Sequence, residues 1–392
     1  MQIKWYLEMK NNEAIELNPS TMQKIFSWVS VAVLVYFVLV AVSTVSGGFK
    51  IFSGGSAGAE QIFAFATNPF VALLLGILVT ALVQSSSTVT SVIVGLVAGG
   101  LPISIAIPMV MGANMGTTIT NTFVSMGHIR DKQEFQRAFS AATVHDFFNI
   151  LAVAIFLPLE IAFGMLEKMA TYLAEFFVGS SSLSIKEFNF IKPLTKPAVN
   201  QIKELASALP FETSTTGLVM VFIGIFMIGF SVTFLGKVLK AVMVGRAKTV
   251  LHNAIGRGPI GGILSGTAVT IMVQSSSTTT SLMIPLAGSG VFTTRQIFPF
   301  TLGANIGTTI TALLAATSIS GDTAQLAMTI ALVHVMFNVF AVALIYGIPV
   351  LREIPIKCAE ALARQGTENK FIAFGYVIGV FFALPGLMIV FN

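Results

Sequence analysis

The sequence VQSSST at residues 83–88 recurs unchanged at residues 273–278. A second motif, GANMGTTIT at residues 112–120, recurs as GANIGTTIT at residues 303–311. The two motifs keep their order, and the copies are offset by 190 and 191 residues in a chain of 392. Self-similarity at a nearly fixed offset indicates that one structural unit has been duplicated.

A third pair of motifs extends the duplication. Val-His at residues 144–145, followed by Asn149, matches Val-His at residues 333–334, followed by Asn338, at an offset of 189 residues. Three motifs in the same order are very unlikely to recur by chance. Two copies of one unit therefore fill most of the chain.

The composition places both copies in a membrane. Hydrophobic residues make up 55% of the chain and charged residues only 10%, against about 25% charged residues in an ordinary soluble domain. Apolar runs of about 20 residues can cross the hydrocarbon core as helices. We therefore predict an all-α polytopic membrane protein. Its predicted transmembrane helices cover residues 25–46, 102–125, 139–163, 215–236, 296–318, 325–349 and 370–391.

Each copy also contains an apolar stretch that QSSST interrupts, at residues 68–99 and 258–289. The two arms of each stretch are too short for two full spans, so we predict a re-entrant helical hairpin that adds no crossing. A broken transmembrane helix is predicted at each GANxGTT motif, in 102–125 and 296–318. Three crossings per copy place the second copy upside down, as in transporters built from inverted-topology repeats.

Basic loops set the predicted orientation. Lys and Arg collect on cytoplasmic loops, and residues 126–138, 237–257 and 350–370 are rich in them. The net charge of +5 thus reflects topology rather than nucleic-acid binding. The first apolar run is long enough to span, so no cleaved signal is expected, and a lone cysteine, Cys358, excludes an intrachain disulfide. The predicted organisation is a cytoplasmic N-terminal tail (1–24), inverted repeat 1 (25–164), an extracellular loop (165–214), inverted repeat 2 (215–349), and a cytoplasmic loop with a C-terminal transmembrane helix (350–392).

The duplicated motifs predict a polar site at mid-membrane. Irregular backbone at that depth is tolerated only where it faces protein or a wet cavity. Half-helix N-termini suit an anion, whereas hydroxyls and freed carbonyls suit a hard cation such as sodium. Neither hairpin and neither predicted broken helix contains Lys or Arg, so bound cations would have to supply the positive charge. We expect the backbone around Asn114, Gly116, Asn305 and Gly307 to shape this site, although a single Gly-x-x-x-Gly usually serves helix packing.

Asp146 lies within an apolar run, beside His145, Phe147, Phe148 and Asn149. A carboxylate within a span is expensive and indicates function, and the second copy has Val335 and Met336 at this point. We expect an additional cation site in the first copy. The alternative is that Asp146 lies near the membrane edge and pairs with a loop base. His145 and His334 are expected to form hydrogen bonds across helices rather than to bind a transition metal.

These motifs, together with RAFSAATVHDFFN at residues 137–149, closely resemble the type II sodium-dependent phosphate cotransporter family over roughly residues 60–350. The resemblance implies inward co-transport of divalent hydrogen phosphate with sodium by alternating access. The long loop lacks the cysteines and glycosylation sites of the animal members, so a bacterial plasma-membrane location is expected. The loop charges place the N-terminus in the cytoplasm. Asp146 matches the electrogenic members of the family, whereas Ser140 departs from them. The oligomeric state is left open, with a homodimer as one alternative.

The resemblance also implies the site residues. Sodium ions are the implied coupling ions, and no other cofactor is implied. Phosphate is implied near Ser85, Ser86, Ser275 and Ser276; sodium is implied near Gln84, Thr118, Thr120, Asp146, Gln274, Ser275, Thr308 and Thr311.

Other functions remain as alternatives. A sodium-coupled transporter of sulfate or a dicarboxylate would have a similar Ser-rich site, and a channel would conduct without sodium-dependent saturation. A membrane hydrolase using Ser, His145 and Asp146 is disfavoured, because adjacent residues on a helix point about 100° apart. The serines are also duplicated while the aspartate is not. No enzymatic activity is therefore predicted.

Overall fold

The computed structural model describes residues 21–179, 191–254 and 258–391, and within these ranges it contains helices and no strand. The helices of the first half of the chain are α2 (Thr21–Ser53), α3 (Ser56–Ile62), η2 (Ala64–Ala66), α4 (Pro69–Val83), α5 (Ser86–Gly99), α6 (Ile103–Gly116), α7 (Ile119–Met126), α8 (Lys132–Phe163), α9 (Met165–Gly179) and α10 (Ile191–Ser207). Those of the second half are α11 (Thr213–Ala254), α12 (Gly258–Val273), α13 (Ser276–Ser281), α14 (Met283–Gly288), α15 (Thr294–Thr317), α16 (Ala324–Ala341), η3 (Val342–Tyr346), α17 (Pro349–Glu368), α18 (Lys370–Ile378), η4 (Gly379–Ala383) and α19 (Leu384–Val390).

Seven segments of the described chain are helical, long and apolar enough to cross a membrane, and each overlaps one of the seven predicted spans, so that prediction is confirmed. The arms around the first QSSST, α4 and α5, and the first arm around the second, α12, are shorter apolar helices. The spanning segments are Ile25–Ser53, Ile103–Met126, Lys132–Phe163, Thr213–Leu239, Thr294–Thr317, Ala324–Tyr346 and Lys370–Val390.

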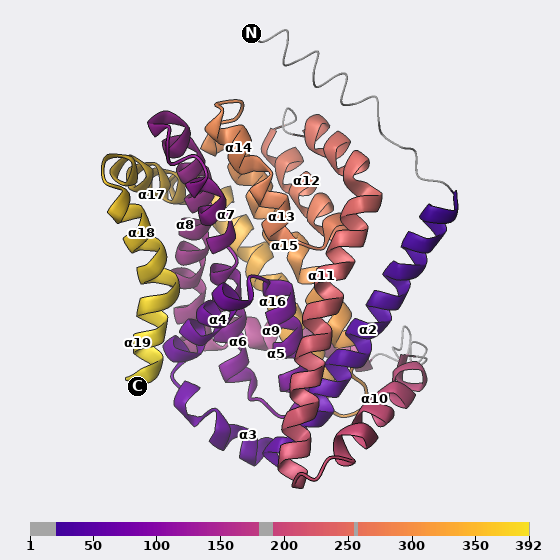
Figure 1. Ribbon diagram of the computed structural model, residues 1–392. Helices are drawn as coiled ribbons and strands as arrows, with labels where there is room; N and C mark the ends of the chain where they lie inside the picture. Colours follow the sequence, from indigo (N-terminus) through magenta and orange to yellow (C-terminus); the bar gives the residue numbers. More distant parts are fainter. Residues whose placement is uncertain (1–20, 180–190, 255–257, 392) are drawn as a thin grey trace.

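The first helices of the two copies lie side by side. In Figure 1, α2 descends toward α3 at the lower end of the molecule, while α11 rises from the lower end to the upper end, so the two run in opposite directions. The α4–α5 hairpin lies in the lower half of this view, and α12, α13 and α14 lie in the upper half (Figure 1). Equivalent segments of the two copies therefore occupy opposite ends of the molecule.

Glycines of the second motif pack each hairpin onto its neighbouring span. α6 packs against α4, and α15 packs against α12 in the same manner. A Cβ atom added to Gly112 would lie 2.0 Å from the carbonyl oxygen of Leu73, and one added to Gly303 would lie 1.9 Å from that of Ile263. Only glycine permits backbones to approach this closely.

Local sequence signals explain where several helices begin and end. Asp131 caps α8, because its carboxylate accepts hydrogen bonds from the amides of Gln133 and Glu134. Thr293 caps α15 in a reciprocal capping box with Gln296. Gly164, with a φ of 58°, ends α8 in the left-handed conformation that favours glycine.

The predicted break in the second GANxGTT helix is wrong. α15 runs without interruption from Thr294 to Thr317, and the hydroxyl of Thr308 donates to the Ala304 carbonyl oxygen one turn earlier. In the first copy the break is confined to Thr117 and Thr118, whose backbones stay right-handed between α6 and α7. Thr can bond its own helix in an apolar span, so the motif does not force unwinding.

Three segments that we expected to be loops contain helices. Residues 165–214 include α9 and α10, α11 continues through residues 237–254, and α17 occupies most of residues 350–370. α17 packs on α8, and α9 packs on α16. The buried face of α17 includes Ile356, Ala359 and Ala363, a helical periodicity that its high charge content obscured.

Candidate functional site

The two QSSST motifs form the same sharp reversal. Gln84 and Gln274 have φ angles of 59° and 54°, and they are the two residues other than glycine with positive φ in the described chain. Each ends the first arm of its hairpin. The next residue, Ser85 or Ser275, is extended and accepts a hydrogen bond from the amide three positions later at 3.2 Å, capping the second arm.

Both reversals are tied to the second motif through a glutamine side chain. The hydroxyl of Thr120 donates to Oε1 of Gln84 at 2.8 Å, and the hydroxyl of Thr311 donates to Oε1 of Gln274 at 2.9 Å. The structure thus brings four of the residues implied as sodium ligands together in two equivalent pairs. Both pairs present oxygen atoms, which sodium prefers.

The histidines link the two halves. Nε2 of His145 donates to Oδ1 of Asn305 at 2.6 Å, and Nε2 of His334 donates to Oδ1 of Asn114 at 3.0 Å. Each bond joins a histidine of one copy to the asparagine of the other copy's GANxGTT motif. The prediction that these histidines hydrogen-bond across helices is confirmed.

The same asparagines extend this network through their amide groups. Nδ2 of Asn305 donates to Oδ1 of Asn149 at 2.8 Å, and Nδ2 of Asn114 donates to Oδ1 of Asn338 at 2.8 Å. Asn149 in turn donates to the carbonyl oxygen of Asn114 at 3.1 Å. All four are at most 3% exposed. Because the amide groups of all four asparagines are hydrogen-bonded, they fix α6, α8, α15 and α16 relative to one another.

Asp146 is buried beside this network, with 2% of its surface exposed. The hydroxyl of Tyr376 donates to its Oδ2 atom at 3.1 Å, whereas the hydroxyl of nearby Thr118 donates to the carbonyl oxygen of Met115 at 2.8 Å. Its Oδ1 atom has no hydrogen-bond partner in the described chain, where Asp146 also forms no ion pair. The alternative of a membrane-edge aspartate paired with a loop base does not hold among these residues.

Sequence reasoning missed Tyr376. This tyrosine lies on α18, outside both copies, and its ring stacks on Phe147 with centroids 6.0 Å apart. Nothing in the duplication points to it. The available signal was a tyrosine inside an apolar span, since a buried phenol hydroxyl usually has a partner.

The second arm of each hairpin packs against helices of the other copy. α5 packs against α15 and α16, while α13 packs against α7. The hydroxyls of Thr280 and Ser281 both donate to Oδ1 of Asn121, at 2.9 and 3.0 Å. Ser86 and Ser276 are buried at the starts of these crossing arms.

Some predicted site residues also make structural contacts. The Thr308 hydroxyl donates to the Ala304 carbonyl oxygen of its own helix. Gly116 and Gly307 face the first arms of their hairpins, where an added Cβ would lie 2.6 Å from the Ile77 carbonyl oxygen and 2.6 Å from Cβ of Thr270. Their contacts are helix packing.

The residues that could hold an ion here are oxygen donors. Across the described ranges, no group of three or more His, Cys, Asp or Glu residues is placed to hold a metal ion. The available ligands are amide, hydroxyl and carboxylate oxygens, which suit a hard monovalent or divalent cation rather than a soft transition metal.

Seven spanning helices around a buried polar centre define a polytopic α-helical integral membrane protein. The chain belongs to the Na+/Pi-cotransporter family, whose model matches residues 37–184 and 225–348. These two matched blocks contain every duplicated motif and leave out α17, α18 and α19.

Curated relatives carry matching names. The chain is 31% identical to sodium-dependent phosphate transport protein 2B of Homo sapiens over 436 residues, which covers 89% of this chain and 63% of that protein. It is 32% identical to sodium-dependent phosphate transport protein 2A of Rattus norvegicus over 420 residues, covering 90% of this chain and 66% of that protein. The chain thus spans under two thirds of either relative. No solved structure matches the chain at a significant level.

Proposed function

We propose that this chain imports inorganic phosphate, as divalent hydrogen phosphate, together with sodium by alternating access across a bacterial plasma membrane. Family membership and the names of the relatives support the substrate and the coupling ion. The polar centre supplies oxygen ligands rather than a set of catalytic groups, which favours transport over hydrolysis.

The fold that we propose consists of two inverted-topology repeats, residues 25–164 and 215–349, each with a re-entrant hairpin. The opposite directions of α2 and α11 support the inversion. The hairpin arms α4, α5 and α12 have 15, 14 and 16 residues, fewer than the roughly 20 residues that a full span needs.

The orientation that we propose places the tail 1–24 and the segment 350–370 in the cytoplasm and residues 165–214 outside. Basic residues in 126–138 and 350–370 support this assignment. Residues 1–20 lie outside the described part of the chain.

The phosphate site that we propose lies between the two reversals, at Ser85, Ser86, Ser275 and Ser276. The first amides of α5 have no acceptor within the helix, so they can donate to an anion. The crossing of α5 and α13 into opposite copies supports a shared site. No Lys or Arg lies in either hairpin, so the anion needs accompanying cations.

The observation that carries the proposal is the duplicated Gln–Thr hydrogen bond. We infer two equivalent sodium sites, one at Gln84 and Thr120 and one at Gln274 and Thr311. In each site, a sodium ion would be coordinated by the Gln amide oxygen and the Thr hydroxyl oxygen, which are hydrogen-bonded to each other in this structure. Ser275 and Thr308 are the further ligands inferred for the second site.

A third sodium site is inferred at Asp146 and Thr118. The unpaired Oδ1 atom of Asp146 supports it, because a buried carboxylate oxygen without a donor is costly unless a cation binds. Two sodium ions would neutralise divalent phosphate, and a third would make transport electrogenic.

The proposal is tested with purified protein in proteoliposomes, with the sodium gradient and the membrane potential set independently. Uptake of labelled phosphate should saturate with sodium and vanish when potassium or choline replaces it. Equal uptake in all three media would refute the coupling. Excess sulfate should leave uptake unchanged; full competition by sulfate or by a dicarboxylate would favour another anion as substrate.

The serines give a second test. Ser276→Ala should weaken phosphate affinity about tenfold, the expected loss for one hydrogen bond to a charged group. Ser85→Ala should act similarly. Unchanged uptake kinetics in both variants would exclude the shared phosphate site while leaving sodium coupling untouched.

A further inference from the structure

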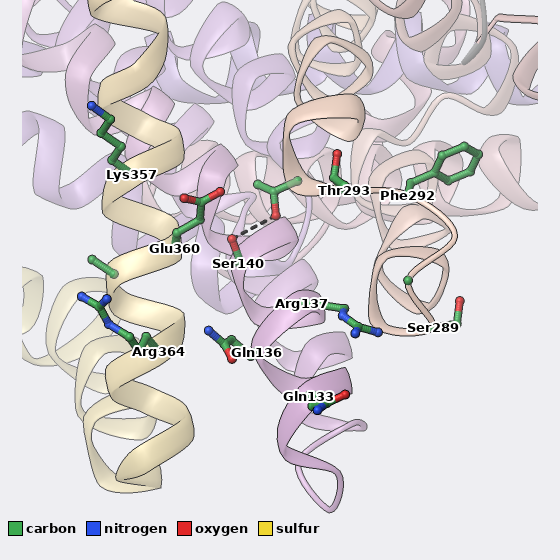
Figure 2. Close-up of a pocket in the computed structure, with 13 residues that line it drawn as sticks. Gln133, Gln136, Arg137, Ser140, Ser289, Phe292, Thr293, Lys357, Glu360 and Arg364 are labelled. Carbon is green, nitrogen blue, oxygen red and sulfur yellow. Dashed lines mark hydrogen bonds between the residues drawn. The ribbon is translucent and has the colours of Figure 1, made fainter.

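A cavity of about 930 Å³ lies apart from the hairpin reversals, between the first turns of α8, the turn that joins α14 to α15, and α17 (Figure 2). Its lining includes Arg137 from α8 and Lys357, Glu360 and Arg364 from α17. No residue of either QSSST or GANxGTT motif lines it. The cavity is therefore separate from the proposed transport site.

The lining carries an excess of positive charge, since three bases accompany one carboxylate. Within the described chain, none of the three bases forms an ion pair within 4.0 Å. Lys357 interacts at longer range with Glu353, but that carboxylate is already hydrogen-bonded to Arg295, which lowers the pKa of Glu353. The three cationic side chains are thus available to an anion.

The side chain of Arg137 occupies space that is free because residue 290 is a glycine. A Cβ atom on Gly290 would lie 2.8 Å from Nη1 of Arg137, so the guanidinium rests against the bare backbone of that turn. Figure 2 shows this guanidinium directed toward the Ser289 turn, whereas Arg364 extends from α17 on the other side of α8. The two guanidiniums thus come from independent elements and line different parts of the cavity.

Neutral donors complete the lining. The hydroxyls of Ser140 and Thr294 bond each other at 2.9 Å, and both residues are buried (Figure 2). Thr293 and Thr294 begin α15, a helix of 24 residues. The partial positive charge of that helix end adds to the field of the bases.

We propose that this cavity is a second oxyanion-binding site, at the cytoplasmic mouth of the protein, which receives phosphate after its release at mid-membrane. The direction of travel depends on the proposed function; the anion chemistry depends on the lining alone. Guanidinium and ammonium groups bind multiply charged oxyanions through charge-assisted hydrogen bonds. Because the protein supplies the positive charge here, this site should bind phosphate without sodium, unlike the hairpin site.

The experiment measures binding of labelled inorganic phosphate to the purified full chain in potassium gluconate without sodium, and again with sodium. Saturable sodium-free binding is expected, with competition by sulfate. The double variant Arg137→Gln/Arg364→Gln should weaken sodium-free binding about tenfold or more. Both side chains are exposed, so the substitutions are compatible with folding.

The matched control is Arg130→Gln/Lys132→Gln. It removes the same charge at the same end of α8 but alters no lining residue, and it should keep sodium-free binding. Absence of sodium-free binding in the unsubstituted protein, or equal losses in both double variants, would overturn the proposal. Sodium-dependent binding reports the hairpin site in the same samples: its retention shows that the variants are folded, and its absence in the unsubstituted protein would count against the proposed function alone.

Discussion

The two halves of the molecule make the same hydrogen bonds but differ beside the carboxylate. Each half has a left-handed Gln bonded to a Thr, and each has a His bonded to the other half's Asn. Only the first half has an acid, Asp146, where the second has Val335.

The helix interruption is also confined to the first half, at Thr117 and Thr118, and Thr118 is the threonine near Asp146. α15 is continuous at the equivalent place. The features found in one half alone, the aspartate and the helix interruption, therefore lie close together near Asp146. The duplicated Gln–Thr and His–Asn hydrogen bonds occur in both halves. We conclude that the duplicated bonds belong to the common machinery and that the Asp146 region is an addition to it.

The largest effect is expected from the glycines that pack both halves. Gly112→Ala and Gly303→Ala should each cost more than about 3 kcal/mol of stability, because the new Cβ would overlap a backbone carbonyl oxygen. Thermal unfolding followed by size-exclusion chromatography in detergent measures this loss. Gly229→Ala is the control, since its Cβ would meet a single atom at 3.9 Å. If one of the two alanine variants kept its stability, the packing of α6 on α4 and that of α15 on α12 would not be equivalent.

Removing the carboxylate of Asp146, which the second half lacks, should abolish the net current that accompanies phosphate uptake. Asp146→Gly is expected to keep sodium-dependent phosphate uptake while charge movement per phosphate falls about tenfold or more, because the third sodium loses its only anionic ligand. Currents from proteoliposomes on a solid-supported membrane, divided by tracer uptake, give this ratio. Val335→Gly is the control at the equivalent position. Unchanged current in Asp146→Gly would assign charge movement to the duplicated sites.

The duplicated sodium pairs should respond alike. Gln84→Ala and Gln274→Ala are each expected to raise the half-saturating sodium concentration about tenfold, as loss of an oxygen ligand to a cation predicts. Sodium titrations of phosphate uptake measure this shift. Combining each change with Thr120→Val or Thr311→Val should add little, since the partners act as one unit. A response in only one half would break the functional equivalence inferred from the hydrogen bonds.

The smallest effect is expected at Tyr376. In Tyr376→Phe the Asp146 carboxylate loses the one donor to Oδ2, so it should attract sodium more strongly. We expect a half-saturating sodium concentration about threefold lower, the scale of one neutral hydrogen bond. This shift should disappear in an Asp146→Gly background. If it persists there, Tyr376 acts through packing on Phe147 instead.

The sequence anticipates what its own repetition marks. The spans follow from apolar runs, whereas the two reversals and the hydrogen bonding of both histidines across helices follow from motifs that occur twice, because each copy tests the interpretation of the other. The asparagine partners of the histidines were not predicted. Tyr376 occurs in no copy, so its contact with Asp146 depends on tertiary packing that one chain segment cannot disclose. The continuous α15 is missed for a different reason. Gly and Thr are weak helix formers in water, but in this span glycine permits close packing against α12, and Thr308 bonds its own helix.

The charge of α17 makes this helix hard to recognise in the sequence. It carries Arg352, Glu353, Lys357, Glu360 and Arg364, a charge content that predicts a cytoplasmic loop. Its apolar stripe includes Ile356, Ala359 and Ala363. A charged outer face and a narrow buried stripe are typical of a helix that lies on the rest of the protein. The cavity that this helix helps to form was therefore beyond prediction as well.

The left-handed backbone at Gln84 and Gln274 lowers the stability of the fold, while their side chains supply oxygens for the proposed sodium sites. A residue with a Cβ costs about 1 kcal/mol in this conformation, and glycine costs almost nothing. Substituting glycine at both hairpin reversals would relieve this strain but also remove two amide oxygens and the hydrogen bonds that Thr120 and Thr311 donate to them. Because each of those hydrogen bonds is worth about 1 kcal/mol, gain and loss would nearly cancel, and such a variant would stay folded while no longer responding to sodium.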